Sequence, residues 1–169
     1  NPDLPQLMLL AKPQIVVANA GENELKSFDP AQRGLPAHTL PVSARVEAEL
    51  TRLTDDERVD YLDSLGVTEP GLARVIREAY RSLGLITFYT YNDKEARAWT
   101  VKAGAKAPEA AGKIHTDFQS HFIKAEVIAL EDFIAHGGEQ GAKLAGKMRI
   151  EGKNYVVKDG DIIYFRVAA

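Results

Sequence analysis

Hydrophobic residues in this chain follow two different spacings, and the change falls at Gly84. Up to Gly84 the longest patterns repeat every three or four residues, as in amphipathic helices, whereas beyond it apolar and polar residues alternate as in strands. This change predicts two domains, residues 1–84 and residues 85–169. The first is expected to be α/β and the second α+β.

A short strand pattern stands near the start of the first domain. The β-branched run at residues 15–17 leads into Asn19-Ala20-Gly21-Glu22. An apolar run followed by Asn, Gly and a carboxylate is typical of a buried parallel strand whose carboxyl end opens into a ligand-facing loop. A second strand is predicted over residues 39–44, and residues 23–37 between the two are predicted to be loop.

Two helices are expected to complete this domain. Thr54 and Glu57 have the spacing of a capping box, so one helix should begin after Thr54 and end at Gly66. The other should begin near Thr68, with Pro70 in its first turn, and end at Gly84. Its apolar positions keep helical spacing, and we expect them to pack in a core: Leu72, Val75, Ile76, Ala79, Tyr80 and Leu83.

The second domain is predicted to contain strands around one main helix. The pattern is a hairpin (85–91 and 95–101), a helix (108–118), a strand (123–130), short helices (131–147) and two more strands (148–157 and 162–167). This order of elements matches a ubiquitin-like β-grasp.

Composition and charge narrow the function classes. The chain has no Cys, which excludes disulfides, thiolate metal sites and Cys nucleophiles. No apolar run approaches the roughly 18 residues needed to cross a bilayer. Residues 1–84 carry a net charge of about −4 and residues 85–169 about +1, so charge alone does not indicate nucleic-acid binding. We expect a cytoplasmic monomer without membrane contact. Because the first residue is Asn, we also expect it to be a piece of a longer protein.

The loop after the first strand resembles a base-recognition motif. In P-loop nucleotide hydrolases this position usually carries Asn-Lys-x-Asp, whose carboxylate binds guanine, and a Ser-Ala-(Lys/Arg) segment after the next strand adds further contacts. The corresponding residues here are Asn19, Ala20 and Glu22, followed by Ser43, Ala44 and Arg45. The alternative is an ordinary turn with Glu22 in solvent and an ordinary strand end.

A family resemblance is dense over residues 68–169. Glu-Ala-Arg-Ala-Trp-Thr-Val at residues 95–101 and Ala-Ala-Gly-Lys-Ile-His-Thr-Asp-Phe at residues 110–118 are similar to the TGS domain of the YchF-type Obg-like ATPases. So is Ala-Gly-Lys-Met-Arg-Ile-Glu-Gly-Lys-Asn-Tyr-Val-Val-Lys-Asp-Gly-Asp at residues 145–161. Residues 19–22 match more loosely, at the segment where this family carries Asn-x-x-Glu.

This resemblance implies a ribosome-associated ATPase with a P-loop domain and a C-terminal TGS domain. It implies ATP in preference to GTP as the nucleotide, and Mg²⁺ dependence. The sequence contains no Gly-x-x-x-x-Gly-Lys-(Ser/Thr), so we expect the phosphate and Mg²⁺ ligands upstream and no catalytic residue in this chain. The other candidate function is a nonenzymatic β-grasp adaptor that binds RNA or protein and keeps a remnant of a nucleotide domain.

Aromatic and basic residues of the second domain suggest a contact with ribosomal RNA. Side chains of this kind provide stacking platforms and neutralise phosphates. The candidates are Tyr89, Tyr91, Lys94, Arg97, Lys102 and Lys106. The alternative is that Trp99 beside them is core and that the lysines protect a sheet edge.

Overall fold

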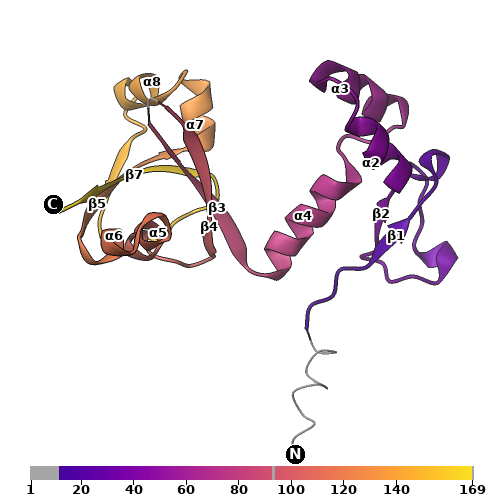
Figure 1. Ribbon diagram of the computed structural model, residues 1–169, viewed down its shortest axis with the longest axis horizontal. Helices are drawn as coiled ribbons and strands as arrows, with labels where there is room; N and C mark the ends of the chain where they lie inside the picture. The colour runs from indigo at the N-terminus through magenta and orange to yellow at the C-terminus, as the bar shows by residue number, and fades with distance from the viewer. Residues whose placement is uncertain (1–11, 93, 169) are drawn as a thin grey trace, which may run out of the picture. The chain divides into compact units, whose positions relative to one another are not determined.

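The computed structural model describes residues 12–92 and 94–168, which form two compact units (Figure 1). One unit ends at Leu83 and the other begins at Gly84. The first eleven residues of the predicted first domain lie outside the described range.

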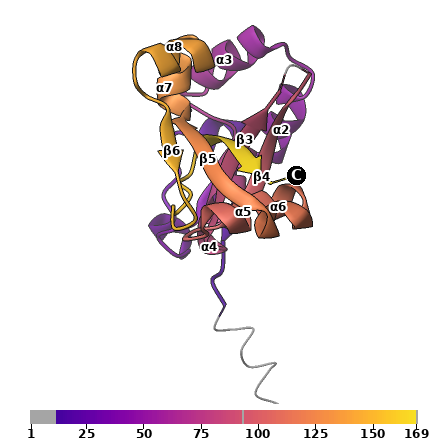
Figure 2. The same cartoon turned by 90° about the vertical axis from the view of Figure 1, so that its left-hand side faces the viewer.

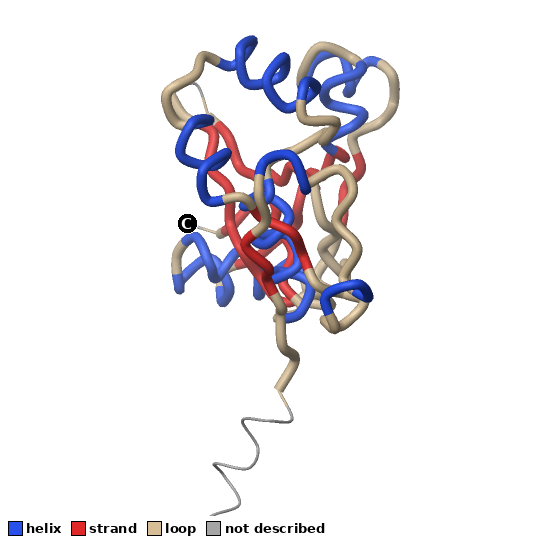
Figure 3. Tube along the Cα trace, turned by 90° about the vertical axis from the view of Figure 1, so that its right-hand side faces the viewer, coloured by secondary structure: helices blue, strands red, loops and turns tan. Residues whose placement is uncertain are grey.

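The first unit has two short strands followed by three helices. Residues 20–39 connect the strands as loop, interrupted by two single-turn 3-10 helices (Figure 3). The elements in chain order are β1 (Val17–Asn19), η1 (Glu22–Glu24), η2 (Ala31–Arg33), β2 (Leu40–Val42), α2 (Ala44–Leu50), α3 (Asp55–Ser64) and α4 (Gly71–Ser82).

β1 and β2 pair in parallel, with Asn19 opposite Val42. Leu40 donates its N–H to the Val16 carbonyl at 2.9 Å, and Ala20 donates to the Val42 carbonyl at 2.9 Å. Because successive backbone groups of a strand point to opposite sides, Pro41 between these residues directs its nitrogen to the outer edge of β2. Proline has no N–H, so this edge lacks a donor at its centre.

Local signals in α3 agree with the structure. Glu57 accepts a hydrogen bond from the Thr54 N–H at 2.8 Å, which confirms the predicted capping box. Leu65 caps the other end, and Gly66 follows with a φ of 67°, a conformation that glycine adopts without strain. The core of this unit gathers residues of α2, α3 and the loops: Val46, Leu50 and Leu62, with Leu25, Tyr61, Leu65 and Val67 against them.

The expectation that the α4 stripe forms core is wrong for the described part of the chain. No residue of α4 is buried, and Leu72 and Ile76 are 54% and 50% exposed. The helix also begins at Gly71 and not near Thr68 as expected, because Pro70 is its N-cap and not part of its first turn. Helical spacing identified the apolar face, but the described residues bring too few partners to cover it.

The second unit is a mixed five-stranded sheet with helices on both faces (Figure 2). The strand order is β4-β3-β7-β5-β6, with β3 and β7 parallel and the other neighbours antiparallel. Its elements are β3 (Leu85–Tyr91), β4 (Ala96–Lys102), α5 (Ala107–Ile114), α6 (Thr116–Ser120), β5 (Phe122–Ala129), α7 (Leu130–Ala135), α8 (Glu139–Leu144), β6 (Arg149–Glu151) and β7 (Asp161–Val167).

α5 packs on one face of this sheet, against Phe88 and Phe165. Small residues, Ala110 and Ala111, let the helix approach closely and are fully buried. α7 lies on the other face, where the rings of Phe133 and Tyr91 meet edge-on with their centroids 5.5 Å apart. α5 with α6 and α7 with α8 also gather toward opposite ends of the sheet (Figures 1 and 2).

Two predicted elements of this unit are shorter than expected. The helix predicted over residues 108–118 is interrupted at His115, whose extended backbone (φ −153°) ends α5 and begins α6. Its ring nitrogen Nδ1 accepts a hydrogen bond from the Asp117 N–H at 3.3 Å, which satisfies a free donor of α6. The strand predicted over residues 148–157 is paired only over Arg149–Glu151 and at a single bridge of Val156 with Lys106.

Candidate functional site

The two predicted base-recognition segments meet at one edge of the β1–β2 sheet. Parallel pairing places both carboxyl ends at the same edge. Asn19 Oδ1 accepts a hydrogen bond from the Ala44 N–H at 3.2 Å, which ties the loop after β1 to the first turn of α2. The two residues are 25 positions apart in the sequence, and the fold brings them into contact.

These segments enclose a pocket of about 350 Å³, within the range of small-molecule sites. Among its lining residues, Ala20 and Ser43 are buried, whereas Asn19 and Arg45 are exposed. Of the six predicted residues, Ala44 alone does not line the pocket and takes part through its N–H. The lining residues are Asn19, Ala20, Gly21, Glu22, Asn23, Ser43 and Arg45.

Glu24, which sequence reasoning did not single out, shapes the loop of this pocket. Its Oε2 accepts a hydrogen bond from the Gly21 N–H at 2.8 Å, and its Oε1 lies 2.8 Å from Arg33 Nη2. The Gly21 N–H, and then Arg33, hold the pKa of Glu24 below its ordinary value. A Glu three residues after Gly21, placed to accept the Gly21 N–H, was the signal that could have identified it.

Tyr61 of α3 is the second residue that sequence reasoning missed. Its hydroxyl donates a hydrogen bond to Glu22 Oε1 at 3.3 Å, across 39 positions of the chain. Burial, and then the negative charge of Glu22, raise the pKa of the Tyr61 hydroxyl. Arg45 Nε lies 3.9 Å from the other oxygen, Glu22 Oε2. Glu22 therefore does not point freely into solvent, as the turn interpretation required.

The six residues predicted to contact RNA do not form one surface in the second unit. Arg97 lies opposite Thr90 in the β3–β4 ladder, so its side chain is on the face opposite to Tyr89 and Tyr91. The Tyr91 hydroxyl donates to Glu139 Oε2 at 2.5 Å, and burial raises the pKa of Tyr91. Tyr91 is thus a residue that packs against Phe133 of α7 and hydrogen-bonds to α8.

The predicted lysines are also separated. Lys94 lies at the tip of the β3–β4 hairpin, where its N–H donates to Asn92 Oδ1 at 2.8 Å. Lys102 ends β4 at the opposite end of the hairpin. Lys106 is the N-cap residue of α5, and its Nζ donates a hydrogen bond to Asn154 Oδ1 at 3.4 Å. Trp99 packs against the core and donates its Nε1–H to Thr90 Oγ1 at 2.8 Å.

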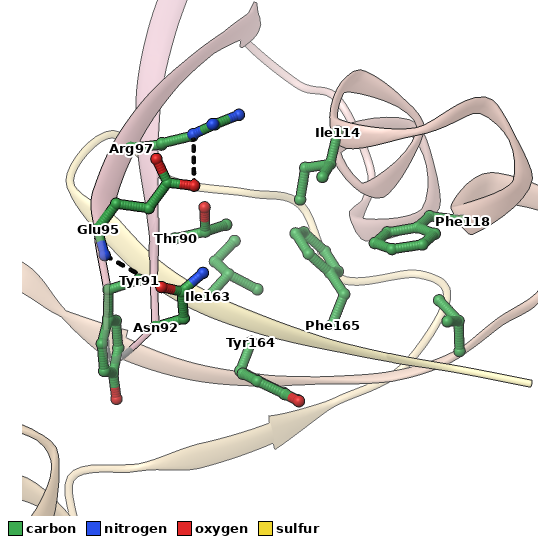
Figure 4. Close-up of a pocket in the computed structure, with 11 residues that line it drawn as sticks. Thr90, Tyr91, Asn92, Glu95, Arg97, Ile114, Phe118, Ile163, Tyr164 and Phe165 are labelled. Atoms are coloured by element: carbon green, nitrogen blue, oxygen red, sulfur yellow. Dashed lines mark hydrogen bonds and ion pairs between the residues drawn. The ribbon is translucent and has the colours of Figure 1, made fainter.

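A separate pocket of about 380 Å³ opens on the α5 face of the second unit (Figure 4). Arg97 and Glu95 form an ion pair at its rim, with Nε and Oε1 2.9 Å apart. Phe118 and Ile114 lie on the opposite side from this pair, with Phe165 between them (Figure 4). Its lining residues are Thr90, Tyr91, Asn92, Glu95, Arg97, Ile114, Phe118, Ile163, Tyr164, Phe165 and Val167.

Comparison with known proteins defines the class. Residues 85–168 match the family model YchF-GTPase_C, described as "Protein of unknown function (DUF933)". "Ribosome-binding ATPase YchF" of Haemophilus ducreyi is 51% identical over 164 residues, covering 94% of this chain and 45% of that protein. The protein of the same name from Escherichia coli O157:H7 is 50% identical over 163 residues, covering 93% and 45%.

Solved structures agree with the sequence matches. The Schizosaccharomyces pombe YchF GTPase superposes with a TM-score of 0.79 at 32% identity, covering 96% of this chain and 46% of that one. This is a mixed α/β protein with the fold of a YchF GTPase. The chain belongs to the YchF family. It spans about half the length of the curated relatives it matches. None of the described helices is long and apolar enough to cross a membrane.

Proposed function

We propose that this chain is part of a ribosome-associated protein that hydrolyses ATP in preference to GTP. In this proposal the first unit is the C-terminal portion of a P-loop nucleotide-binding domain and carries the loops that bind the base. The observation that carries it is the Asn19–Ala44 hydrogen bond, which joins two loops around a pocket of suitable size. The names of the relatives, ribosome-binding ATPases, support the same activity.

The pocket residues fit an adenine base. Asn19 holds the two loops together and keeps its amide NH₂ for the base, while Ala20 offers a small apolar surface to the ring. Glu22, Ser43 and Arg45 complete the wall, with the Ala44 N–H fixed by Asn19. Bound ATP would supply the phosphoryl group that is transferred to water, and the residues here would orient its base.

Magnesium is not assigned to any residue of these units. Among the described residues no group of three or more His, Cys, Asp or Glu side chains could hold a metal ion. Phosphate binding, Mg²⁺ and the catalytic step are therefore placed, in this proposal, in the part of the relatives that this chain does not span.

We propose that the second unit is a TGS domain with the β-grasp arrangement. The parallel pairing of its first and last strands at the centre of the sheet, and the packing of α5 on one face, support this assignment. In this proposal the unit contacts the ribosome and the protein is a cytoplasmic monomer. Since the candidate RNA residues are divided between faces, Lys94 and Arg97 near the hairpin tip are the better candidates for that contact.

The base-site proposal is tested in the full-length protein that contains this chain, by measuring ATP affinity calorimetrically. Asn19→Ala removes both the loop-to-loop hydrogen bond and the amide, so ATP should bind about tenfold more weakly. The matched control is Asn154→Ala, which removes the same kind of side chain at an exposed position of the second unit outside the pocket and should alter the affinity less than twofold. Equal effects of the two substitutions would contradict a base-binding role for Asn19.

The ribosome proposal is tested by cosedimentation of the same protein with ribosomes over a series of salt concentrations. Lys94→Ala should weaken binding and reduce its salt dependence, because a phosphate contact is lost. Lys106→Ala, at the start of α5 and away from the hairpin tip, serves as the control. A wild-type protein that binds ribosomes but neither ATP nor GTP would instead support the nonenzymatic adaptor.

A further inference from the structure

Both carboxylate oxygens of Glu22 face a partner within the first unit. Oε1 accepts the hydrogen bond from the Tyr61 hydroxyl at 3.3 Å, and Oε2 lies 3.9 Å from Arg45 Nε. The Glu22 side chain is 30% exposed, whereas that of Arg45 is 82% exposed. Tyr61 is therefore the more constrained partner of Glu22, whereas the Arg45 side chain is largely in solvent.

Tyr61 is well placed to hold Glu22 in one position. It projects from α3, and its ring packs against the core formed by Val46, Leu50 and Leu62. A half-buried ring has few alternative orientations, so the hydroxyl is presented at a fixed point. Burial and the neighbouring carboxylate also keep the hydroxyl protonated near neutral pH, which leaves it a donor.

The chemistry of the two purines makes this hydrogen bond relevant to base selection. Guanine presents a ring N–H beside an amino group, and a free carboxylate accepts hydrogen bonds from both with its two oxygens. Adenine presents a ring nitrogen acceptor at the corresponding position, which a free carboxylate repels. A carboxylate whose orientation is fixed by another donor does not align both oxygens with the guanine edge, and so it loses the advantage of the two-oxygen contact.

We propose that Tyr61 is a specificity-determining residue that holds Glu22 away from two-oxygen contact with guanine. It is a positioning residue, since it acts through Glu22 and does not touch the base. This inference rests on the proposed function of the pocket as a base site. It also explains how a loop with Glu in place of Asp would favour ATP: the carboxylate is present, but its orientation is set by contacts within the protein.

The test measures the dissociation constants of ATP and GTP in the full-length protein by calorimetry. Tyr61→Phe keeps the buried ring and removes only the hydroxyl. The GTP affinity relative to the ATP affinity should rise about 2- to 10-fold, the range that one hydrogen bond is worth. Tyr164→Phe removes the same hydroxyl from an exposed residue of β7 and should leave the ratio unchanged.

A double-substitution cycle shows whether the effect passes through Glu22. In a Glu22→Gln background, Tyr61→Phe should produce no further rise in the ratio, because the carboxylate that Tyr61 restrains is absent. A general loosening of α3 would change both nucleotides alike and would persist in that background.

The outcomes separate the inference from the function on which it rests. If the wild type binds ATP more tightly than GTP and Tyr61→Phe leaves the ratio unchanged, the inference is overturned and the base site stands. A rise of the same size in the Glu22→Gln background also overturns it. A wild type that binds neither nucleotide overturns the proposed function and the inference together.

Discussion

Replacing Phe88 by Ala should unfold the second unit at much lower denaturant concentration and leave the first unit unchanged. Phe88 is fully buried at the centre of β3, and its ring meets that of Phe165 edge-on at 5.9 Å. Removing a buried aromatic side chain costs about 3–5 kcal/mol, because both its transfer energy and its packing contacts are lost. Single domains are stable by about 5–15 kcal/mol, so a large part of the stability of this unit should disappear.

The chain has a convenient reporter for this experiment. Its single Trp, Trp99, packs against the same core. Urea titration followed by Trp fluorescence therefore reports the second unit alone, both in the whole chain and in a piece containing residues 84–169. We expect that piece to fold independently, since its core cluster is made from its own residues.

The control is Ile150→Ala on β6, where the side chain is 68% exposed. This substitution should change the free energy of unfolding by about 0.5 kcal/mol or less. A loss below about 1.5 kcal/mol for Phe88→Ala, or equal losses for the two substitutions, would refute the packing argument. A piece of residues 84–169 that stays unfolded would refute the domain boundary.

Two other experiments test the second unit in different ways. Gly141→Ala would place a Cβ 1.8 Å from the His136 carbonyl oxygen and should cost about 1–3 kcal/mol by the same titration, whereas Gly152→Ala, with no atom within 4 Å of its Cβ, should be nearly neutral. Hydrogen bonds from Arg166 hold the pKa of Glu126 below its ordinary value of 4.5, so the stabilisation they give is complete above that pH and is lost as the pH falls through the folded-state pKa. The difference in unfolding free energy between wild type and Glu126→Gln should therefore narrow as the pH falls below the ordinary carboxyl value of 4.5, and a constant difference would argue against the assignment.

Sequence reasoning predicted features that depend on nearby residues. The capping box of Thr54 and Glu57 needs only three positions of chain, and the structure confirms it. The change of spacing at Gly84 likewise follows from local pattern, and it stays a prediction of a domain boundary, while contact clustering separates the compact units between Leu83 and Gly84. Asn19 and Ser43 could be placed at the same edge because parallel strands bring their carboxyl ends together.

Features that depend on tertiary contact were not predictable. The hydrogen bond of Tyr61 to Glu22 joins residues on separate elements, and no spacing indicates it. Tyr91 was assigned to an RNA surface because strand alternation shows which side chains share a face. Alternation does not show that Glu139 of a later helix accepts a hydrogen bond from the Tyr91 hydroxyl. The apolar stripe of α4 was assigned to a core for the same reason: periodicity identifies a face and does not identify its cover.

Pro41 at the centre of β2 determines at which edge the small sheet can be extended by another strand. Pro41 leaves the outer edge of β2 without a donor where a further strand would need one, so a strand added there could not form a continuous ladder. β1 carries no proline within Val17–Asn19, and its outer edge keeps its full set of backbone groups. A further strand would therefore pair more readily beside β1 than beside β2, and the pocket lined by Asn19 and Ser43 would then lie near the edge of the sheet.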